Sequence, residues 1–590
     1  MIVLDVETYR DYFLVAMKDT ATGKLRTFER YDGQDFDARE LGGIMSKYLT
    51  VGFNSFGYDL PIIASAMVGS TNAELKRLSD RIITSGKPSW MICKDEDIFI
   101  PKKWDHIDLI EVAPGQASLK IYGGRLGAPK LQDLPIAPDA SITPEQREQL
   151  RRYCENDLDT TALLLDALDK PLDLRVDMSE QYGMDLRSKS DAQIAETVIK
   201  SEMSKLTGKR YGKPEIATDR TFRYQDPGII EFETPQLIET FDAIRAHDFT
   251  LSANGSVQLP KWLKDTKISI GSGVYRMGIG GLHSSEKRQY VEAGDGLLFD
   301  LDVASYYPSI ILQQGLAPET MGEAFLTVYQ SLVSRRLQAK AEGDTSTADT
   351  LKIAINGSFG KLGSKYSALY SPDLLIQTTI TGQLALLMLI ERVEKAGGHV
   401  VSANTDGIVV WCERDTERAI QEAAWDWELS TSYELERTDY ARLASRDVNN
   451  YVAVKPDGST KGKGAFASRG LMKNPDRNIV STAVAEQVAN GTPLEQTVKG
   501  CEDITQFVTV RTVKGGAEWE GEALGKAVRF YASREIPADT CIRYASNGNK
   551  VPNSDGCRPL MDLPETFPSD VDYDAYIEGA EKLLAEVGAC

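Results

Sequence analysis

One stretch, Gly296–Leu312, constrains the fold of this chain more than any other. It begins as an apolar strand in which Asp300 and Asp302 fall two residues apart, so both carboxylates project from one face while the apolar side chains around them project from the other. Carboxylates beside such an apolar run need neutralisation, and a divalent metal is the usual partner. The stretch therefore predicts a metal-binding strand, although a chance buried strand would show the same pattern.

Composition sets only loose limits. The chain has 590 residues, enough for three or four packed units rather than one. Its formal net charge of −20 argues against extended phosphate contact, but acids gathered at metal sites lower the total while a local basic groove can still bind DNA. Composition alone therefore leaves open an acidic enzyme of another class.

The sequence shows no pattern typical of export. No run of 18 or more apolar residues occurs, and the N-terminus enters a strand directly instead of a signal peptide. The seven cysteines are scattered without a Cys-x-x-Cys pair, which favours reduced thiols over a disulfide framework or a zinc site. We therefore expect a cytoplasmic protein without a membrane partner.

Acidic residues recur in the first 175 residues, which read as an α/β domain. Asp5 and Glu7 lie two apart on the N-terminal strand and so share one face, and Asp59 ends a later strand and loop. Asp5 and Glu7 alone would be equally compatible with a solvent-facing pair.

A helix supplies the next acid. Thr143 is a good N-cap, Pro144 suits the first helical position and Gln146 completes a capping box. Further along this helix, Tyr153 and Asp157 are four residues apart and share a face.

Four acids from three elements can act as one site. Asp5, Glu7, Asp59 and Asp157 suit two divalent metals for in-line phosphodiester hydrolysis, and Tyr153 could orient the attacking water.

In order, these residues form the patterns Asp-x-Glu, Asn-x3-Tyr-Asp and Tyr-x3-Asp, which resemble the three motifs of proofreading 3′–5′ exonucleases. The resemblance implies a ribonuclease H-like domain over 1–175. It places Thr8, Asn54 and Tyr58 at the single-stranded 3′ end. Lys130 falls where some relatives carry an assisting lysine, and a plain surface lysine is equally compatible.

The strand of the opening paragraph continues into a second resemblance. Asp302 and Val303 lead to Ser305, Tyr306 and Tyr307, and the whole resembles motif A of family B DNA polymerases. The resemblance implies that Asp302 is catalytic, that Asp302 and Val303 bind metal, and that the three residues from Ser305 to Tyr307 contact the dNTP. Tyr307 falls on the steric-gate position, whose ring would collide with a ribose 2′-OH, while Tyr306 replaces the usual Leu.

Residues 318–362 read as two facing helices with cations on their faces. Arg336 and Lys340 are four residues apart, as are Lys352 and Asn356. Such a set can clamp a triphosphate, although basic helix faces are usually just solvated.

The second helix carries a further motif. The run from Lys352 to residue 360 resembles motif B, with Gly357 in place of Ser and Phe359 in place of Tyr. The resemblance assigns the phosphate contacts to Arg336, Lys340, Lys352 and Asn356.

Residues 398–411 form two apolar runs around a polar turn, which predicts a hairpin. Its turn resembles motif C, Asp-Thr-Asp-Ser, but reads Asn-Thr-Asp-Gly. Asp406 keeps the essential acid, Asn404 removes one negative charge, and Gly407 replaces Ser.

The metals follow from the same resemblance. Two Mg²⁺ or Mn²⁺ ions are expected at the palm, on Asp302, Val303 and Asp406. Two more are expected on the acids of the exonuclease motifs, Asp5, Glu7, Asp59 and Asp157.

Further segments fit the family order. A Gly-rich run at 275–284 resembles a segment placed near the template strand, although an interdomain hinge fits as well. Tyr451 matches the Tyr of a Lys-x-Tyr segment near the primer terminus, and Lys461 and Lys463 are expected to contact the duplex. The expected parts are an exonuclease (1–175), a connection (176–290), a palm (291–317 and 363–445), fingers of two helices (318–362), and a thumb with the C-terminal region (446–590).

The chain is therefore identified as a member of the family B DNA polymerases, of the compact phage type, with a proofreading exonuclease before a right-hand polymerase. This implies a multidomain α/β and α+β fold and a monomer that binds primer-template DNA and dNTPs in the cytoplasm of a bacterial host. A helicase, a sliding clamp or a single-strand-binding protein would be further partners. Two alternatives stay open: an exonuclease with a degenerate palm, and a non-catalytic DNA-binding protein.

Overall fold

The computed structural model describes residues 1–216 and 219–589 and has a multidomain fold that mixes helices and sheets. The six cysteines within these residues are free thiols, as the sequence predicts. The chain divides into two compact units. The first comprises Met1–Ser190, Arg469–Ile479 and Gly500–Tyr576, and the second comprises Asp191–Ser468, Val480–Lys499 and Ile577–Cys590. The predicted segment 446–590 is thus shared between the units.

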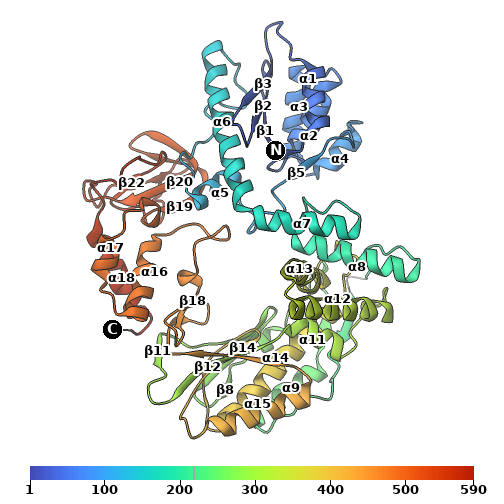
Figure 1. Ribbon diagram of the computed structural model, residues 1–590, viewed down its shortest axis with the longest axis vertical. Helices are drawn as coiled ribbons and strands as arrows, with labels where there is room; N and C mark the ends of the chain where they lie inside the picture. The colour runs from blue at the N-terminus through green and yellow to red at the C-terminus, as the bar shows by residue number, and fades with distance from the viewer. Residues whose placement is uncertain (217–218, 590) are drawn as a thin grey trace. The chain divides into compact units, whose positions relative to one another are not determined.

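The first unit begins with a five-stranded mixed sheet, drawn in blue in Figure 1. Its order is β3-β2-β1-β4-β5, with β4 parallel to both β1 and β5 and the other pairs antiparallel. The strands are β1 (Ile2–Thr8), β2 (Phe13–Asp19), β3 (Leu25–Arg30), β4 (Thr50–Gly52) and β5 (His106–Asp108). The helices are α1 (Ala38–Lys47), α2 (Asp59–Met67), α3 (Asn72–Thr84), α4 (Ser89–Asp95), α5 (Leu119–Leu126), α6 (Pro144–Ala167) and α7 (Asp169–Tyr182).

Helices cover both faces of this sheet, and the alternation along β1 decides what each face receives. Val3 packs into one core cluster with Leu150 and Leu158 of α6, whereas Leu4 and Val6 pack into the other cluster. The acids at positions 5 and 7 share the parity of Val3, so β1 presents them toward α6. Helix α6 starts with the predicted capping box, in which Thr143 and residue 146 bond reciprocally.

A second sheet completes the first unit. Its order is β21-β19-β20-β22, and α5 packs against β19 and β20. Arg529 on β20 is fully buried, and its guanidinium donates to the carbonyl oxygens of Ala128 (2.8 Å) and Leu560 (2.7 Å). The strands are β19 (Thr509–Trp519), β20 (Glu522–Ala532), β21 (Arg543–Tyr544) and β22 (Cys557–Pro559).

The second unit is built on a seven-stranded antiparallel sheet, ordered β15-β12-β14-β13-β10-β9-β8. Helices α9, α14 and α15 lie against one face of it (Figure 1). The strands are β8 (Ile268–Ile270), β9 (Gly273–Gly278), β10 (Gly281–Ser284), β12 (Leu297–Val303), β13 (His399–Asn404), β14 (Gly407–Cys412) and β15 (Leu435–Tyr440). The helices are α9 (Pro235–Ala246), α14 (Pro372–Lys395) and α15 (Glu417–Thr431).

Helix α14 is the longest helix of this core. Within the described residues it alone has the length and composition of a membrane span, yet 83% of its most apolar window is buried inside the protein. Its side chains join the strands of the sheet in one core cluster. This burial is what a central core helix requires.

A pair of long helices follows α11 (Tyr306–Gln313), as the sequence predicts: α12 (Glu323–Glu342) and α13 (Thr345–Leu362). Both pack against each other and against α8 (Asp191–Thr207), as Figure 1 shows. A Cβ atom on Gly357 would lie 2.9 Å from the Cβ atom of Ala195. The close approach of α8 therefore accounts for the glycine that replaces the family's Ser.

The remaining elements are shorter. A four-stranded antiparallel sheet has the order β11-β16-β17-β18, and β6 pairs with β7. The strands are β11 (Gln289–Glu292), β16 (Arg442–Asp447), β17 (Asn450–Val454), β18 (Thr460–Lys463), β6 (Thr221–Arg223) and β7 (Asp248–Thr250). The helices are α10 (Lys261–Asp265), α16 (Asn478–Asn490), α17 (Leu494–Lys499) and α18 (Tyr573–Glu586).

Candidate active sites

The four N-terminal acids lie close enough for their charges to interact. Burial raises the pKa of each of them, and the charge of Asp5 further raises the pKa values of Glu7, Asp59 and Asp157. For Asp157 the pKa reaches about 7. The sheet and two helices thus bring together acids that are up to 152 positions apart in the chain (157 − 5), and cations bound there would relieve this crowding.

The lysine at this site is Lys120, on α5. Its ammonium donates to the Tyr153 hydroxyl over 2.7 Å and lies 4.7 Å from the ring centroid. It is 3.5 Å from the Asp133 carboxylate, and its charge opposes the rise in the pKa of Asp157. Lys130, which the sequence analysis singled out, instead lies 3.8 Å from Asp562 on the surface. Of the two alternatives for Lys130, this position favours the plain surface lysine, and the placement of α5 decides that the Lys120 ammonium reaches Tyr153.

Two of the residues predicted to contact the single-stranded 3′ end lie side by side. The hydroxyls of Thr8 and Tyr58 are 2.7 Å apart, and the Tyr58 hydroxyl is also 2.8 Å from that of Ser79. Asn54 is in the left-handed region at a φ of 60°, in the exposed loop that leads to Asp59.

This loop is held by two buried side chains that the sequence analysis missed. The Asp108 carboxylate accepts from the backbone N–H groups of Asn54 (2.8 Å) and Phe56 (2.9 Å). His106 shares hydrogen bonds with Thr50 (2.8 Å) and Ser55 (2.6 Å), and burial lowers its pKa to about 4. No sequence signal marks this pair, because its partners lie about 50 residues earlier in the chain.

In the second unit, Asp302 and Asp406 line one pocket of about 280 Å³. Asp302 lies opposite Gly407 in the pairing of β12 with β14, and the Val303 N–H donates to the Asp406 carbonyl over 2.8 Å. Burial and the charge of Asp406 raise the pKa of Asp302 to about 7, and burial also raises the pKa of Asp406. Other lining residues are Asp300, Asn404, Tyr451, Lys461 and Lys463.

The two departures in motif C have local causes. The Asn404 amide donates to the Val448 carbonyl over 3.1 Å, a bond that an ionised Asp could not make. A Cβ atom on Gly407 would come within 2.8 Å of the Asp302 carboxylate. Both residues therefore fit the hairpin as it is built here.

The two tyrosines of motif A, Tyr306 and Tyr307, lie in different environments. The Tyr307 ring stacks on Phe359 of α13, with centroids 4.0 Å apart and planes 7° apart, and its hydroxyl donates to the Gly280 carbonyl over 3.1 Å. Tyr306 instead lies in the core at 4% exposure, and its hydroxyl donates to the Gly382 carbonyl. The expectation that Tyr306 contacts the dNTP was therefore wrong, because the turn into α11 points this ring inward.

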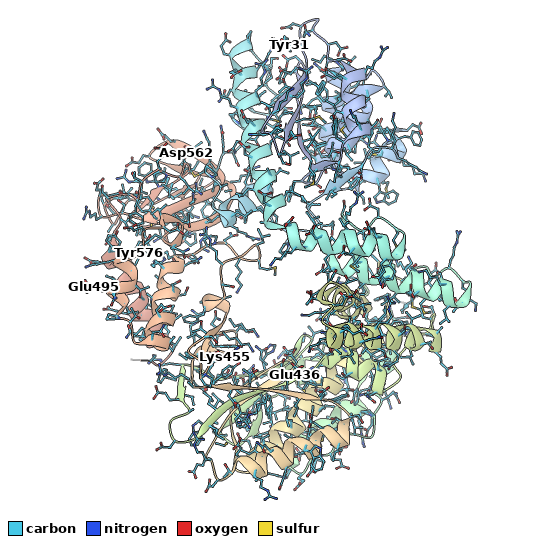
Figure 2. All side chains as sticks on the ribbon, viewed as in Figure 1. Tyr31, Glu436, Lys455, Glu495, Asp562 and Tyr576 are labelled. Carbon is cyan, nitrogen blue, oxygen red and sulfur yellow. The ribbon has the colours of Figure 1, made fainter. Side chains whose placement is uncertain are left out.

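The predicted phosphate-contacting residues are only partly assembled. Arg336 donates to the Ser305 hydroxyl over 3.0 Å, which joins α12 to the end of the motif A strand. Lys340 lies 4.0 Å from the carboxylate of Glu436, which is labelled in Figure 2. Lys352 and Asn356 are exposed on α13.

Neither acid set forms a ready-made metal cage. Among residues 1–216 and 219–589, no group of three or more His, Cys, Asp or Glu side chains is arranged closely enough to hold an ion. The donor chemistry nevertheless suits Mg²⁺ or Mn²⁺, since both sets consist of carboxylates whose pKa values are raised by burial and by one another.

Two curated DNA polymerases are similar to part of this chain. DNA polymerase 1 of Aeropyrum pernix is 25% identical over 207 residues, covering 29% of this chain and 21% of that protein. DNA polymerase II of Escherichia coli is 28% identical over 156 residues, covering 22% of this chain and 20% of that protein. Over these segments the chain is similar to DNA polymerases.

The similarity to curated proteins is partial. The chain matches about a fifth of the length of each curated relative. No protein-family model matches the chain. A solved family B DNA polymerase from Pyrobaculum calidifontis is also similar, with 16% identity and a TM-score of 0.43, covering 99% of this chain and 77% of that one.

Proposed function

We propose that this chain is a template-directed DNA polymerase that adds dNMPs to a primer 3′-OH and proofreads with a 3′–5′ exonuclease. The observation that carries the polymerase is the pocket of β12 and β14. Two carboxylates, that of Asp302 on β12 and that of Asp406 in the turn before β14, share it with Lys461 and Lys463. In this proposal the seven-stranded sheet is the palm, and α12 and α13 are the fingers.

At the polymerase site, Asp302 and Asp406 would hold two Mg²⁺ ions, which activate the primer 3′-oxygen and stabilise the leaving pyrophosphate when bound. Arg336, held by Ser305, supplies a planar cation for the triphosphate. The Tyr307 ring, backed by the ring on α13, fills the space that a ribose 2′-OH would need.

At the exonuclease site, the same logic assigns a metal-holding role to the four N-terminal acids. Tyr153, fixed by the Lys120 ammonium, orients a water for attack on the terminal phosphodiester. The paired hydroxyls of Thr8 and Tyr58 offer hydrogen bonds to the single-stranded 3′ end.

The second candidate is an exonuclease with an inactive palm, which Asn404 and Gly407 suggest. Both residues are explained by local contacts of the hairpin, and Asp406 remains in the pocket. The polymerase is therefore the better supported function. A non-catalytic DNA-binding protein is supported least, because both acid sets are intact.

Primer extension tests the proposal. A primed single-stranded template with Mg²⁺ and dNTPs is given to the wild type, to Asp406→Ala and to the double substitution Asp5→Ala/Glu7→Ala. We expect the wild type to extend, Asp406→Ala only to degrade the primer, and the N-terminal double variant to extend without degrading. Degradation without extension by the wild type would support the exonuclease function and contradict the polymerase function.

A further inference from the structure

Asp300 is the acid that the proposed mechanism does not use. It lies on β12 two residues before Asp302 and lines the same pocket as Asp302 and Asp406. Its side chain is only 13% exposed. A third carboxylate in this pocket must either bind metal with the other two or serve another purpose.

The contacts of Asp300 favour another purpose. Its Oδ2 atom accepts from the Tyr440 hydroxyl over 3.1 Å and from the Lys461 ammonium over 3.2 Å. Within the part of the chain that the structure describes, the carboxylates of Asp302 and Asp406 have no hydrogen-bond or ion-pair partner of this kind. A metal ion bound by Asp300 would have to compete with the Lys461 ammonium for the carboxylate. The carboxylates of Asp302 and Asp406 can bind a metal ion without such competition.

The two partners of Asp300 are themselves held by strands. Tyr440, at the end of β15, is 3% exposed in a small core with Leu298 and Leu443. Lys461 lies on β18, opposite Ala453 of β17. Two strands of different sheets therefore fix both ends of the contact, and the ammonium is held at the wall of the pocket.

We propose that Asp300 is a positioning residue of the polymerase site, which holds the Lys461 ammonium where it meets a phosphate of the primer strand. This inference rests on the proposed function and adds a role to it. A free lysine loses side-chain freedom when it binds a phosphate, but a lysine already held in place has less to lose. The charge of Asp300 raises the pKa values of Asp302 and Asp406, and the Lys461 ammonium that it holds opposes that rise.

A double-substitution cycle tests the coupling. Asp300→Asn, Lys461→Met and both together are placed in the Asp5→Ala/Glu7→Ala background, and incorporation of one dNMP at saturating primer-template is measured across a Mg²⁺ titration. Each single change should slow incorporation by about 3- to 10-fold, and the double variant should be no slower than Lys461→Met, because Asp300 then has nothing to hold. The Mg²⁺ concentration at half-maximal rate should stay within about twofold of wild type.

Two results would overturn the inference. One is a double variant whose loss equals the product of the single losses. The other is a rise of about tenfold or more in the Mg²⁺ requirement of Asp300→Asn, which would make Asp300 a metal ligand. Asp439→Asn is the matched control, since Asp439 pairs with Arg437 on β15, and Arg437 covers the ring of Phe299 on the opposite face of β12.

Binding separates this inference from the proposed function. The Kd for a primer-template is measured for the same four proteins in EDTA, where no turnover occurs. The effects of the two substitutions on Kd should again be non-additive. Additive Kd values would overturn the inference even in a chain that extends primers. A wild type that extends no primer would count against the proposed function alone.

Discussion

Lys120 offers the sharpest separation of the two proposed activities at the scale of a single residue. Its ammonium fixes the Tyr153 hydroxyl and opposes the rise in the carboxylate pKa values. Lys120→Met should lower the degradation rate of a labelled single strand by about 10- to 100-fold and leave primer extension unchanged, because side chains that orient a metal site have effects of this size. The Lys130→Met variant should degrade the labelled strand at the wild-type rate. Loss of degradation in Lys130→Met alone would favour the assisting role that the sequence leaves open for Lys130.

The stack of Tyr307 on Phe359 makes a second prediction for single residues. An aromatic pair contributes about 0.5–1.5 kcal/mol beyond its buried area. Phe359→Ala should therefore lower kcat/KM for dNTPs by about 2- to 10-fold. It should also weaken discrimination against rNTPs, because the Tyr307 ring loses its backing. Competing dATP against ATP in single-nucleotide incorporation measures this, and Phe359→Tyr should behave like the wild type. Unchanged discrimination in Phe359→Ala would show that Tyr307 holds its place unaided.

The loop between β4 and α2 makes a prediction at the scale of an element. Asp108 accepts from two backbone N–H groups of this loop, and hydrogen bonds to a charged group contribute about 1.5–3 kcal/mol each. Asp108→Asn keeps only one acceptor oxygen, so the loop should lose its alignment and exonuclease rate should fall about tenfold or more. Primer extension should be retained, since Asp302 and Asp406 lie in the other unit.

The control for this loop lies three residues earlier. Asp105→Asn removes an exposed carboxylate that pairs with Arg187, and it should leave both activities near wild type. Equal loss of extension and degradation in Asp108→Asn would mean that the substitution disturbs the whole chain and not the loop.

Elements whose signals are local could be predicted from the sequence. The motif A strand was predicted from its alternation, and the start of α6 from its capping box at Thr143. What the sequence could not predict depends on packing between distant segments. The inward turn of Tyr306, the choice of Lys120 over Lys130, and the grip of Asp108 on its loop are each decided by neighbours far away in the chain.

The stability of the first unit should depend on pH. An unfolded Asp loses its proton near its ordinary pKa of about 4, whereas the pKa of Asp157 in the folded chain is about 7, because of burial and the charge of Asp5. Between these values the folded chain binds more protons than the unfolded chain, so the free energy of unfolding falls as pH rises through this window. The stabilisation is present in full below about pH 4 and is lost by about pH 7.

Asp157→Asn should remove this dependence. In EDTA at about pH 8 its Tm should exceed that of the wild type by about 2–4 °C, and at about pH 5 the two should nearly coincide. Calorimetry at both pH values measures the difference. Asp159→Asn, an exposed position on the same helix paired with Lys18, should show no such rise. An equal shift of Asp157→Asn at both pH values would contradict the proton linkage.

Arg529 ties the order of synthesis to the order of folding in the whole molecule. Its guanidinium bonds the carbonyl of Ala128, which lies 401 positions earlier, next to the helix that carries Lys120. A ribosome adding about 5–20 residues per second reaches Arg529 about 20–80 s after Ala128. Throughout that interval the nascent chain carries the acids of the N-terminal site without the sheet that completes their unit. Asp5 and Glu7 are thus synthesised long before the unit that contains them can be completed.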